Sequence, residues 1–76
     1  MNDFSEKECS RRVEVLPDYL RDTLRLMASG LAIKEIADTQ KITASTAYIY
    51  RERVYSKLGV NNLALATRIA VGAKLV

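Results

Sequence analysis

The chain has 76 residues, of which 49% are apolar, so it is long enough for one small domain and too short for two. The 12 Lys and Arg residues outnumber the 9 Asp and Glu residues, which gives a net charge of +3. Cys9 is the only cysteine and there is no histidine, which excludes an internal disulfide and a zinc site with Cys and His ligands. We expect a reduced thiol at Cys9, with an intermolecular disulfide as the alternative, and neither a metal nor a cofactor.

Targeting signals are also missing from the sequence. The first residues lack the apolar run of a signal peptide, and the longest apolar stretch, near the C-terminus, is interrupted by Arg68. We therefore predict a soluble, cytoplasmic domain that makes no contact with a membrane.

The charge is unevenly distributed along the chain. Residues 41–76 contain six basic side chains and one acidic side chain, a net charge of +5, whereas residues 1–40 contain six basic and eight acidic side chains, a net charge of −2. A basic half is typical of a protein that binds a polyanion, although an ordinary solvated surface could have the same counts.

The N-terminal half begins with a polar, irregular segment. Residues 1–15 predict a short flexible arm or linker, and residues 16–76 predict the domain itself. A first helix is expected to begin at Pro17 and Asp18, which suit a first turn, and to end at Gly30. Its inward side is predicted by apolar spacing of three and four residues: Leu20, Thr23, Leu24, Met27 and Leu31.

Three further helices are expected after the first. The second covers about residues 33–40, the third covers about residues 44–58 behind an N-cap at Thr43, and the fourth covers about residues 62–73. The fourth helix is apolar on more than one side, which predicts that one side meets the core and another meets a second subunit. The predicted dimer interface contains Leu63, Leu65, Ala66 and Ile69. Burial of this helix by the N-terminal arm is the alternative.

The third helix has two chemically different sides. At 100° per residue, Ala47, Val54 and Leu58 fall on one side, which is expected to face the core, with Tyr50 beside them. The opposite side carries the predicted base-contacting residues: Ser45, Tyr48, Ile49, Glu52 and Arg53. The DNA major groove fits such a side, because it displays thymine methyl groups, cytosine amino donors and guanine acceptors.

Other residues of this region are expected to meet phosphate groups. Thr43 and Thr46 lie at the start of the third helix, where hydroxyl groups and backbone N–H groups suit an anion. Arg51 and Lys57 are further candidates, although solvated flanking charge is an equal alternative for both. A short helix, a tight turn and a longer helix, braced by flanking helices, are the parts of a helix-turn-helix domain.

Four short motifs, in this order, resemble a known family, the LuxR-type (GerE-like) DNA-binding domain. They are LRLMASGL at residues 24–31, KEIA at residues 34–37, Ile42-Thr43-x-x-Thr46, and KLGVNN at residues 57–62. The likeness extends from residue 16 to residue 76. It implies an all-α, four-helix domain whose third helix enters the major groove and whose fourth helix forms a two-fold dimer. It also implies that Lys34 and Thr46 touch phosphate, whereas Tyr48, Ile49 and Glu52 face bases.

The sequence departs from this family at several positions. Tyr48 replaces a usual lysine, Tyr50 replaces a histidine, and Glu52 is acidic where a polar or basic residue is common. Gln40 replaces a core leucine, and Lys41 stands where glycine relieves backbone strain. These changes suggest an altered base preference or a weakened affinity for DNA.

Two hypotheses of different classes therefore stand. The first is a sequence-specific, double-stranded DNA-binding transcription regulator that acts as a homodimer, without catalytic residues, and as either a stand-alone protein or a fragment of a larger one. The alternative is an interaction module with impaired DNA binding that forms heterodimers with a larger LuxR-type regulator. The regulator hypothesis also allows RNA polymerase as a protein partner.

Overall fold

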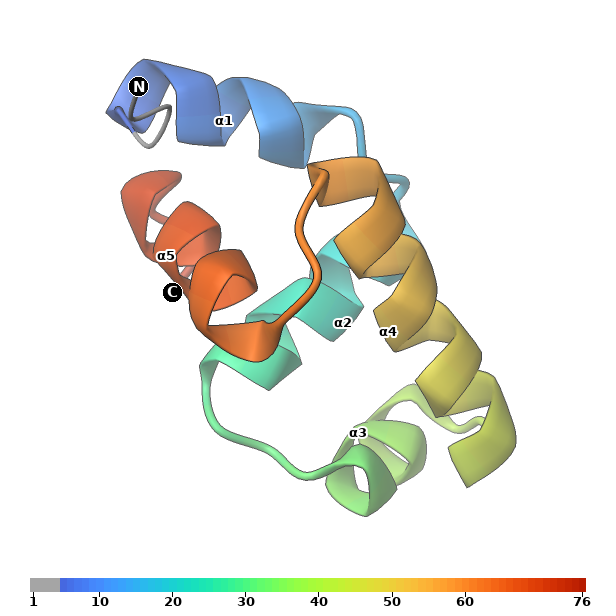
Figure 1. Ribbon diagram of the computed structural model, residues 1–76. Coiled ribbons are helices and arrows are strands. Elements are labelled where there is room, and N and C mark those ends of the chain that lie inside the picture. Colours follow the sequence, from blue (N-terminus) through green and yellow to red (C-terminus); the bar gives the residue numbers. More distant parts are fainter. Residues whose placement is uncertain (1–4) are drawn as a thin grey trace.

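The computed structural model describes residues 5–76, which form five α-helices and no strand (Figure 1). The predicted all-α class is confirmed. The helices are α1 (Glu6–Glu14), α2 (Asp18–Ala28), α3 (Ile33–Gln40), α4 (Ala44–Leu58) and α5 (Leu63–Gly72). None of the helices in this range is long and apolar enough to cross a membrane.

Helix α1 contradicts two expectations, a flexible arm over residues 1–15 and a total of four helices. Ser5 caps α1 by accepting a hydrogen bond from the backbone N–H of Glu8, at 3.2 Å. Cys9 and Val13, one turn apart, are buried in the core. Burial of these two side chains, together with the cap, explains why a mostly polar segment is helical. Residues 1–4 of the predicted arm lie outside the described residues.

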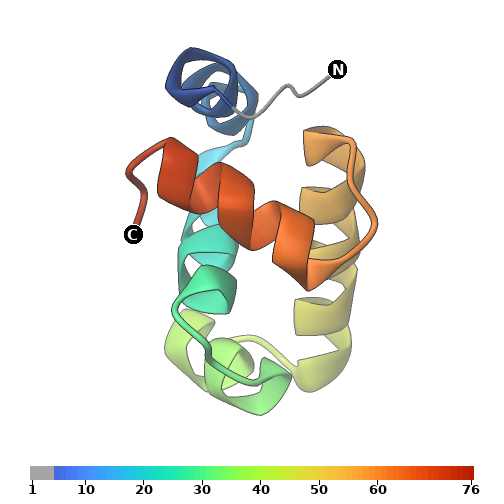
Figure 2. The same ribbon diagram turned by 60° about the vertical axis from the view of Figure 1, so that its left-hand side comes forward.

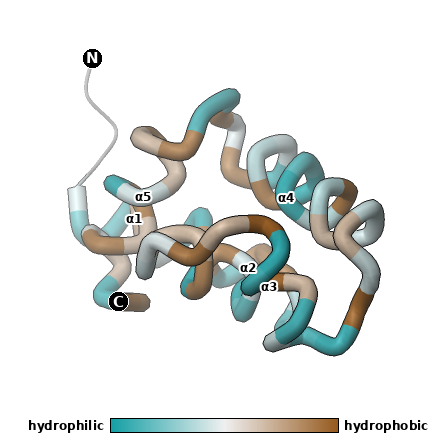
Figure 3. The backbone as a smooth tube through the Cα atoms, turned by 90° about the horizontal axis from the view of Figure 1, so that it is seen from below, coloured by the Kyte–Doolittle hydropathy of each residue, from teal (hydrophilic) through white to brown (hydrophobic). Residues whose placement is uncertain are grey.

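The core lies where α2 meets α4 and α5. Leu20 and Leu24 of α2, Val54 of α4 and Ile69 of α5 are each 0% exposed. Figure 2 shows α5 crossing in front of α2, with α4 running alongside and α1 above them. Along the helices, hydrophobic and hydrophilic residues are interspersed rather than separated into blocks (Figure 3). This is expected of short helices that each turn one side inward.

The pair α3 and α4 forms the helix-turn-helix unit, with α3 and the start of α4 at one end of the molecule and the last turn of α4 near α1 (Figure 1). Lys41 ends α3 in the left-handed conformation, with φ of 59°, and the backbone N–H of Ile42 bonds to the carbonyl oxygen of Ala37 at 2.9 Å. Gly59, with φ of 74°, ends α4 in the same way. Both helix ends therefore fall where the sequence predicted them.

Candidate nucleic-acid interface

The N-terminus of α4 is fixed by two threonines. The hydroxyl oxygen of Thr43 accepts a hydrogen bond from the backbone N–H of Thr46 at 3.1 Å, which is the predicted N-cap. The hydroxyl proton of Thr43 is donated to the hydroxyl oxygen of Thr46 at 3.0 Å. The two hydroxyl groups therefore lie together at the start of α4, a position that suits an anion. Ser45 is exposed in the same turn.

The two sides of α4 differ in burial as the helical spacing predicted. Ala47 and Val54 are 0% exposed, and Leu58 is 2% exposed. On the outward side, the adjacent residues Tyr48 and Ile49 are 50% and 51% exposed. This outward side, which we call the α4 face, carries five residues that line a shallow hollow of about 350 Å³: Tyr48, Ile49, Glu52, Arg53 and Ser56.

Arg53 lies at the border of the α4 face and has a partner on another helix. Its Nη1 donates a hydrogen bond to the hydroxyl oxygen of Tyr19 on α2, at 3.1 Å. The ring of Tyr19 in turn meets the ring of Tyr50 edge-on, with the centroids 4.8 Å apart. Tyr19 was not among the predicted site residues. In the sequence, Tyr19 is an aromatic residue outside the predicted inward side of its helix, and nothing there indicates which residue it would contact.

Arg51 lies differently from the other predicted phosphate contacts. Its guanidinium carbon lies 5.0 Å from the ring centroid of Tyr48 and 5.9 Å from that of Tyr55, and one of its Nη atoms is 3.5 Å from a carboxylate oxygen of Glu52. Its Nε is buried without a hydrogen-bond partner. The side chain therefore lies close to two tyrosine rings and is 34% exposed.

The remaining predicted phosphate contacts lie at the surface. Lys34 is exposed in the first turn of α3, and Lys57 is exposed in the last turn of α4. At a rise of 1.5 Å per residue, roughly 16 Å of helix separates Lys57 from Thr46, so the two would have to meet different phosphates.

The predicted dimer residues of α5 divide into two pairs. Ala66 and Ile69 are 0% exposed and belong to the core of this chain, so they are not available to a second subunit. Their assignment to a dimer interface was wrong, because the side of α5 that meets α2 and α1 is the side that carries them. Leu63 is 47% exposed and Leu65 is partly buried.

Metal and proton chemistry add little to this interface. Among residues 5–76, no group of three or more His, Cys, Asp or Glu residues could hold a metal ion. Burial raises the pKa of the Cys9 thiol, an effect that the nearby Arg12 opposes. Cys9 lies on α1, away from the α4 face.

Comparison with known proteins places the chain in a family. The family described as "Bacterial regulatory proteins, luxR family" matches residues 21–70, which include both helices of the helix-turn-helix unit. The chain is similar to the transcriptional regulatory protein MctR of Rhizobium johnstonii, with 39% identity over 56 residues, and to the transcriptional regulatory protein UhpA of Escherichia coli, with 34% identity over 71 residues.

These alignments cover 74% and 92% of this chain but only 26% and 36% of the two relatives, so the chain spans about a third of their length or less. No solved structure matches the chain. The family match confirms the resemblance that the four sequence motifs indicated. The chain belongs to the luxR family of bacterial regulatory proteins.

Proposed function

We propose that the chain binds double-stranded DNA in a sequence-specific manner as part of a cytoplasmic transcription regulator, with α4 in the major groove and no catalytic role. The observation that supports this most directly is the half exposure of Tyr48 and Ile49 on a helix whose other side is fully buried. Such side chains gain nothing in water, but they fit a groove that displays thymine methyl groups. MctR and UhpA are named as transcriptional regulatory proteins, which agrees with this function.

The roles along the α4 face follow from the chemistry of base edges. Ile49 is suited to a thymine methyl group, Glu52 to the amino group of cytosine, and Arg53 to the acceptors of guanine. Ser45 and Tyr48 carry hydroxyl groups that suit either a base edge or the sugar–phosphate backbone.

Phosphate contacts would fix the position of α4 in the groove. The hydroxyl of Thr46 lies at the helix start, and Lys34 and Lys57 are exposed cations on either side. Arg51 is a further candidate for a phosphate contact, because its side chain is 34% exposed and the rings of Tyr48 and Tyr55 lie near its guanidinium group.

We propose further that two copies pair through the outward side of α5. Leu63 and Val71, two turns apart, are 47% and 56% exposed, and Thr67 lies between them at helical spacing. Exposed apolar residues on one side of a helix that ends near the surface are suited to a two-fold contact. Sedimentation over a range of concentrations would test it, because Val71→Glu should shift the mass towards the monomer and leave the fold intact.

Selection of bound duplexes from a random pool at two salt concentrations tests the DNA function. The expected result is one enriched half-site, repeated at a fixed spacing, and an affinity that falls with a log–log slope of about −0.9 for each phosphate neutralised. Failure to enrich any duplex at low salt would contradict the proposal.

A second candidate function rests on charge at the α4 face. Glu52 adds a negative charge to this face, and Arg51 lies 3.5 Å from its carboxylate. The face is therefore less basic than one that binds DNA phosphates usually is. A module that pairs with a larger LuxR-type regulator without binding DNA would enrich no duplex. It would co-purify with that regulator, and Val71→Glu would abolish the association.

A further inference from the structure

We propose that Tyr19, which lies on α2 and outside the helix-turn-helix pair, is a positioning residue that orients Arg53 and so sets the base that Arg53 selects. The proposal rests on the proposed DNA function. The evidence for it is a series of contacts that begins at a buried residue of α2, includes the last residue of α3 and ends at the border of the α4 face.

The last contact of this chain is the one to Arg53. The hydroxyl oxygen of Tyr19 accepts a hydrogen bond from Nη1 of Arg53 at 3.1 Å, although the two residues are 34 positions apart in the sequence. The ring of Tyr19 meets the ring of Tyr50 at an interplanar angle of 61°, with the centroids 4.8 Å apart. An edge-on aromatic pair restricts the ring, so the hydroxyl is held at one place beside α4.

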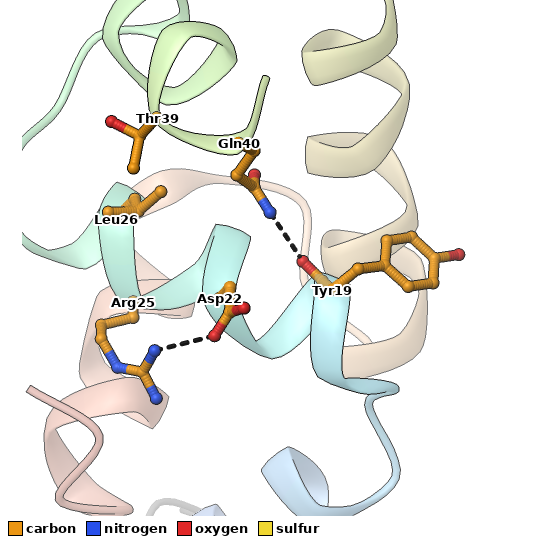
Figure 4. Close-up of a pocket in the computed structure, with 6 residues that line it drawn as sticks. All are labelled: Tyr19, Asp22, Arg25, Leu26, Thr39 and Gln40. Carbon is orange, nitrogen blue, oxygen red and sulfur yellow. Dashed lines mark hydrogen bonds and ion pairs between the residues drawn. The ribbon is translucent and has the colours of Figure 1, made fainter. Parts of the chain in front are cut away.

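The backbone of Tyr19 is also held, by hydrogen bonds to its carbonyl oxygen. Its carbonyl oxygen accepts a hydrogen bond from Nε2 of Gln40 at 3.0 Å, at the end of α3. The hydroxyl of Thr23, which is 0% exposed, lies 2.7 Å from Oε1 of Gln40 and 2.9 Å from the same carbonyl oxygen of Tyr19. Figure 4 shows the amide of Gln40 pointing at this carbonyl oxygen, while the ring of Tyr19 extends the other way, towards α4.

Such anchoring matters because arginine is a long side chain with many rotamers. Ordering it on binding costs free energy, and a partner that holds it in advance lowers that cost. The bond to Tyr19 uses one N–H of Arg53 and leaves four N–H groups of the guanidinium for a guanine. A bidentate contact to guanine depends on the orientation of the guanidinium plane. By fixing this orientation, the hydroxyl of Tyr19 strengthens the preference of Arg53 for guanine over other bases.

The test compares Tyr19→Phe with Tyr55→Phe in the full chain. Both changes remove one tyrosine hydroxyl and keep the ring, but only the first removes the acceptor for Arg53. Competition binding against duplexes that differ at one base pair of the selected half-site measures discrimination. Tyr19→Phe should reduce discrimination at one base pair about three- to tenfold, with unchanged salt dependence, and Tyr55→Phe should leave it unchanged. Arg53→Met should reduce discrimination at the same base pair at least as much.

The double variant Tyr19→Phe/Arg53→Met decides whether Tyr19 acts through Arg53. Discrimination equal to that of Arg53→Met alone supports the proposal, whereas independent losses from the two changes overturn it. Equal weakening of all duplexes by Tyr19→Phe, with a smaller salt slope, also overturns it, because Arg53 would then be a phosphate contact.

A measurement without DNA separates this inference from the proposed function. In nitrogen-15 NMR spectra of the free protein, Tyr19→Phe should shift the side-chain signal of Arg53 and increase its motion on the nanosecond timescale, and Tyr55→Phe should do neither. An unchanged Arg53 signal in Tyr19→Phe overturns the positioning role even if the chain binds DNA. If the unmodified chain enriches no duplex, the proposed function fails and the role in specificity fails with it, whatever the NMR spectra show.

Discussion

Arg12 on α1 donates a hydrogen bond from Nη1 to the carbonyl oxygen of Leu58, 2.9 Å away, in the last turn of α4. Glu8, one turn earlier on α1, accepts from Nε of the same guanidinium at 3.1 Å. The last carbonyl groups of a helix have no partner within the helix, and the helix dipole makes that end negative. Arg12 supplies both a donor and a positive charge there, so α1 supports the helix that carries the proposed DNA-binding face.

Arg12→Ala should therefore destabilise the domain. The expected loss is about 1–2 kcal/mol of unfolding free energy, because the hydrogen bonds to Leu58 and Glu8 and the favourable dipole interaction disappear together. Urea unfolding followed by circular dichroism measures it. Arg11→Ala is the matched control, since the Arg11 side chain is 67% exposed and forms a 3.7 Å ion pair with Glu8. A loss as large in the control would show that general charge, rather than the contact to Leu58, is responsible.

The contribution of α1 was missed in the sequence for a physical reason. Ser5 and Glu8 have the spacing of a helix cap, and Cys9 and Val13 are one turn apart, but a nine-residue helix is marginal on its own. Its stability comes from burial against α5 and from the contact of Arg12 with α4. Neither partner is visible from the segment itself.

The α4 face shows which parts of a site are predictable from sequence. The burial of Ala47 and Val54, and the exposure of Tyr48 and Ile49, follow from helical periodicity alone. The pairing of Arg53 with Tyr19 does not, because it joins two helices whose relative position depends on the packing of the whole core. The same holds for α5, where two apolar sides are present in the sequence and packing on α2 decides which one is buried.

Lys41 should be replaceable by glycine with a gain in stability. Its φ of 59° lies in the left-handed region, which strains any residue with a Cβ atom. Lys41→Gly should raise the unfolding free energy by about 0.5–1 kcal/mol, as measured by thermal or urea unfolding. Lys41→Ala removes the same charge but keeps the Cβ atom, so it should give no such gain. Equal stabilisation by both variants would assign the effect to charge.

Thr23 and Gln40 should be energetically coupled. Thr23 is completely buried, and its hydroxyl lies 2.7 Å from Oε1 of Gln40. Thr23→Val should cost about 1–2 kcal/mol in the unmodified chain, since it leaves polar groups of Gln40 and Tyr19 with one donor fewer. In the Gln40→Leu background the cost should fall by about 1 kcal/mol, which a double-mutant cycle of unfolding free energies measures. Additive losses would mean that the two side chains do not act together.

Cys9 should make stability fall at alkaline pH. Burial raises the pKa of its thiol, so above the ordinary thiol value of about 8.5 the unfolded chain loses a proton that the folded chain keeps. The stabilisation is fully present below that pH and is lost as the pH rises, at a slope of no more than about 1.4 kcal/mol per pH unit. Subtracting the unfolding curve of Cys9→Ala removes the contribution of tyrosines and lysines. A pH-independent difference between pH 8 and 10 would contradict the assignment.

Ile49 and Lys34 should affect DNA binding in different ways if α4 lies in the major groove. Ile49→Ala should change the preferred base pair at one position of the half-site, at a cost of about 1–3 kcal/mol for the original sequence, because a methyl contact is lost. Lys34→Ala should weaken all duplexes about equally and lower the salt slope by about 1. Lys7→Ala removes the same charge from α1 and should change neither quantity. Gel-shift titrations at two salt concentrations distinguish the three variants, and equal behaviour of Ile49→Ala and the unmodified chain would place the groove contact elsewhere.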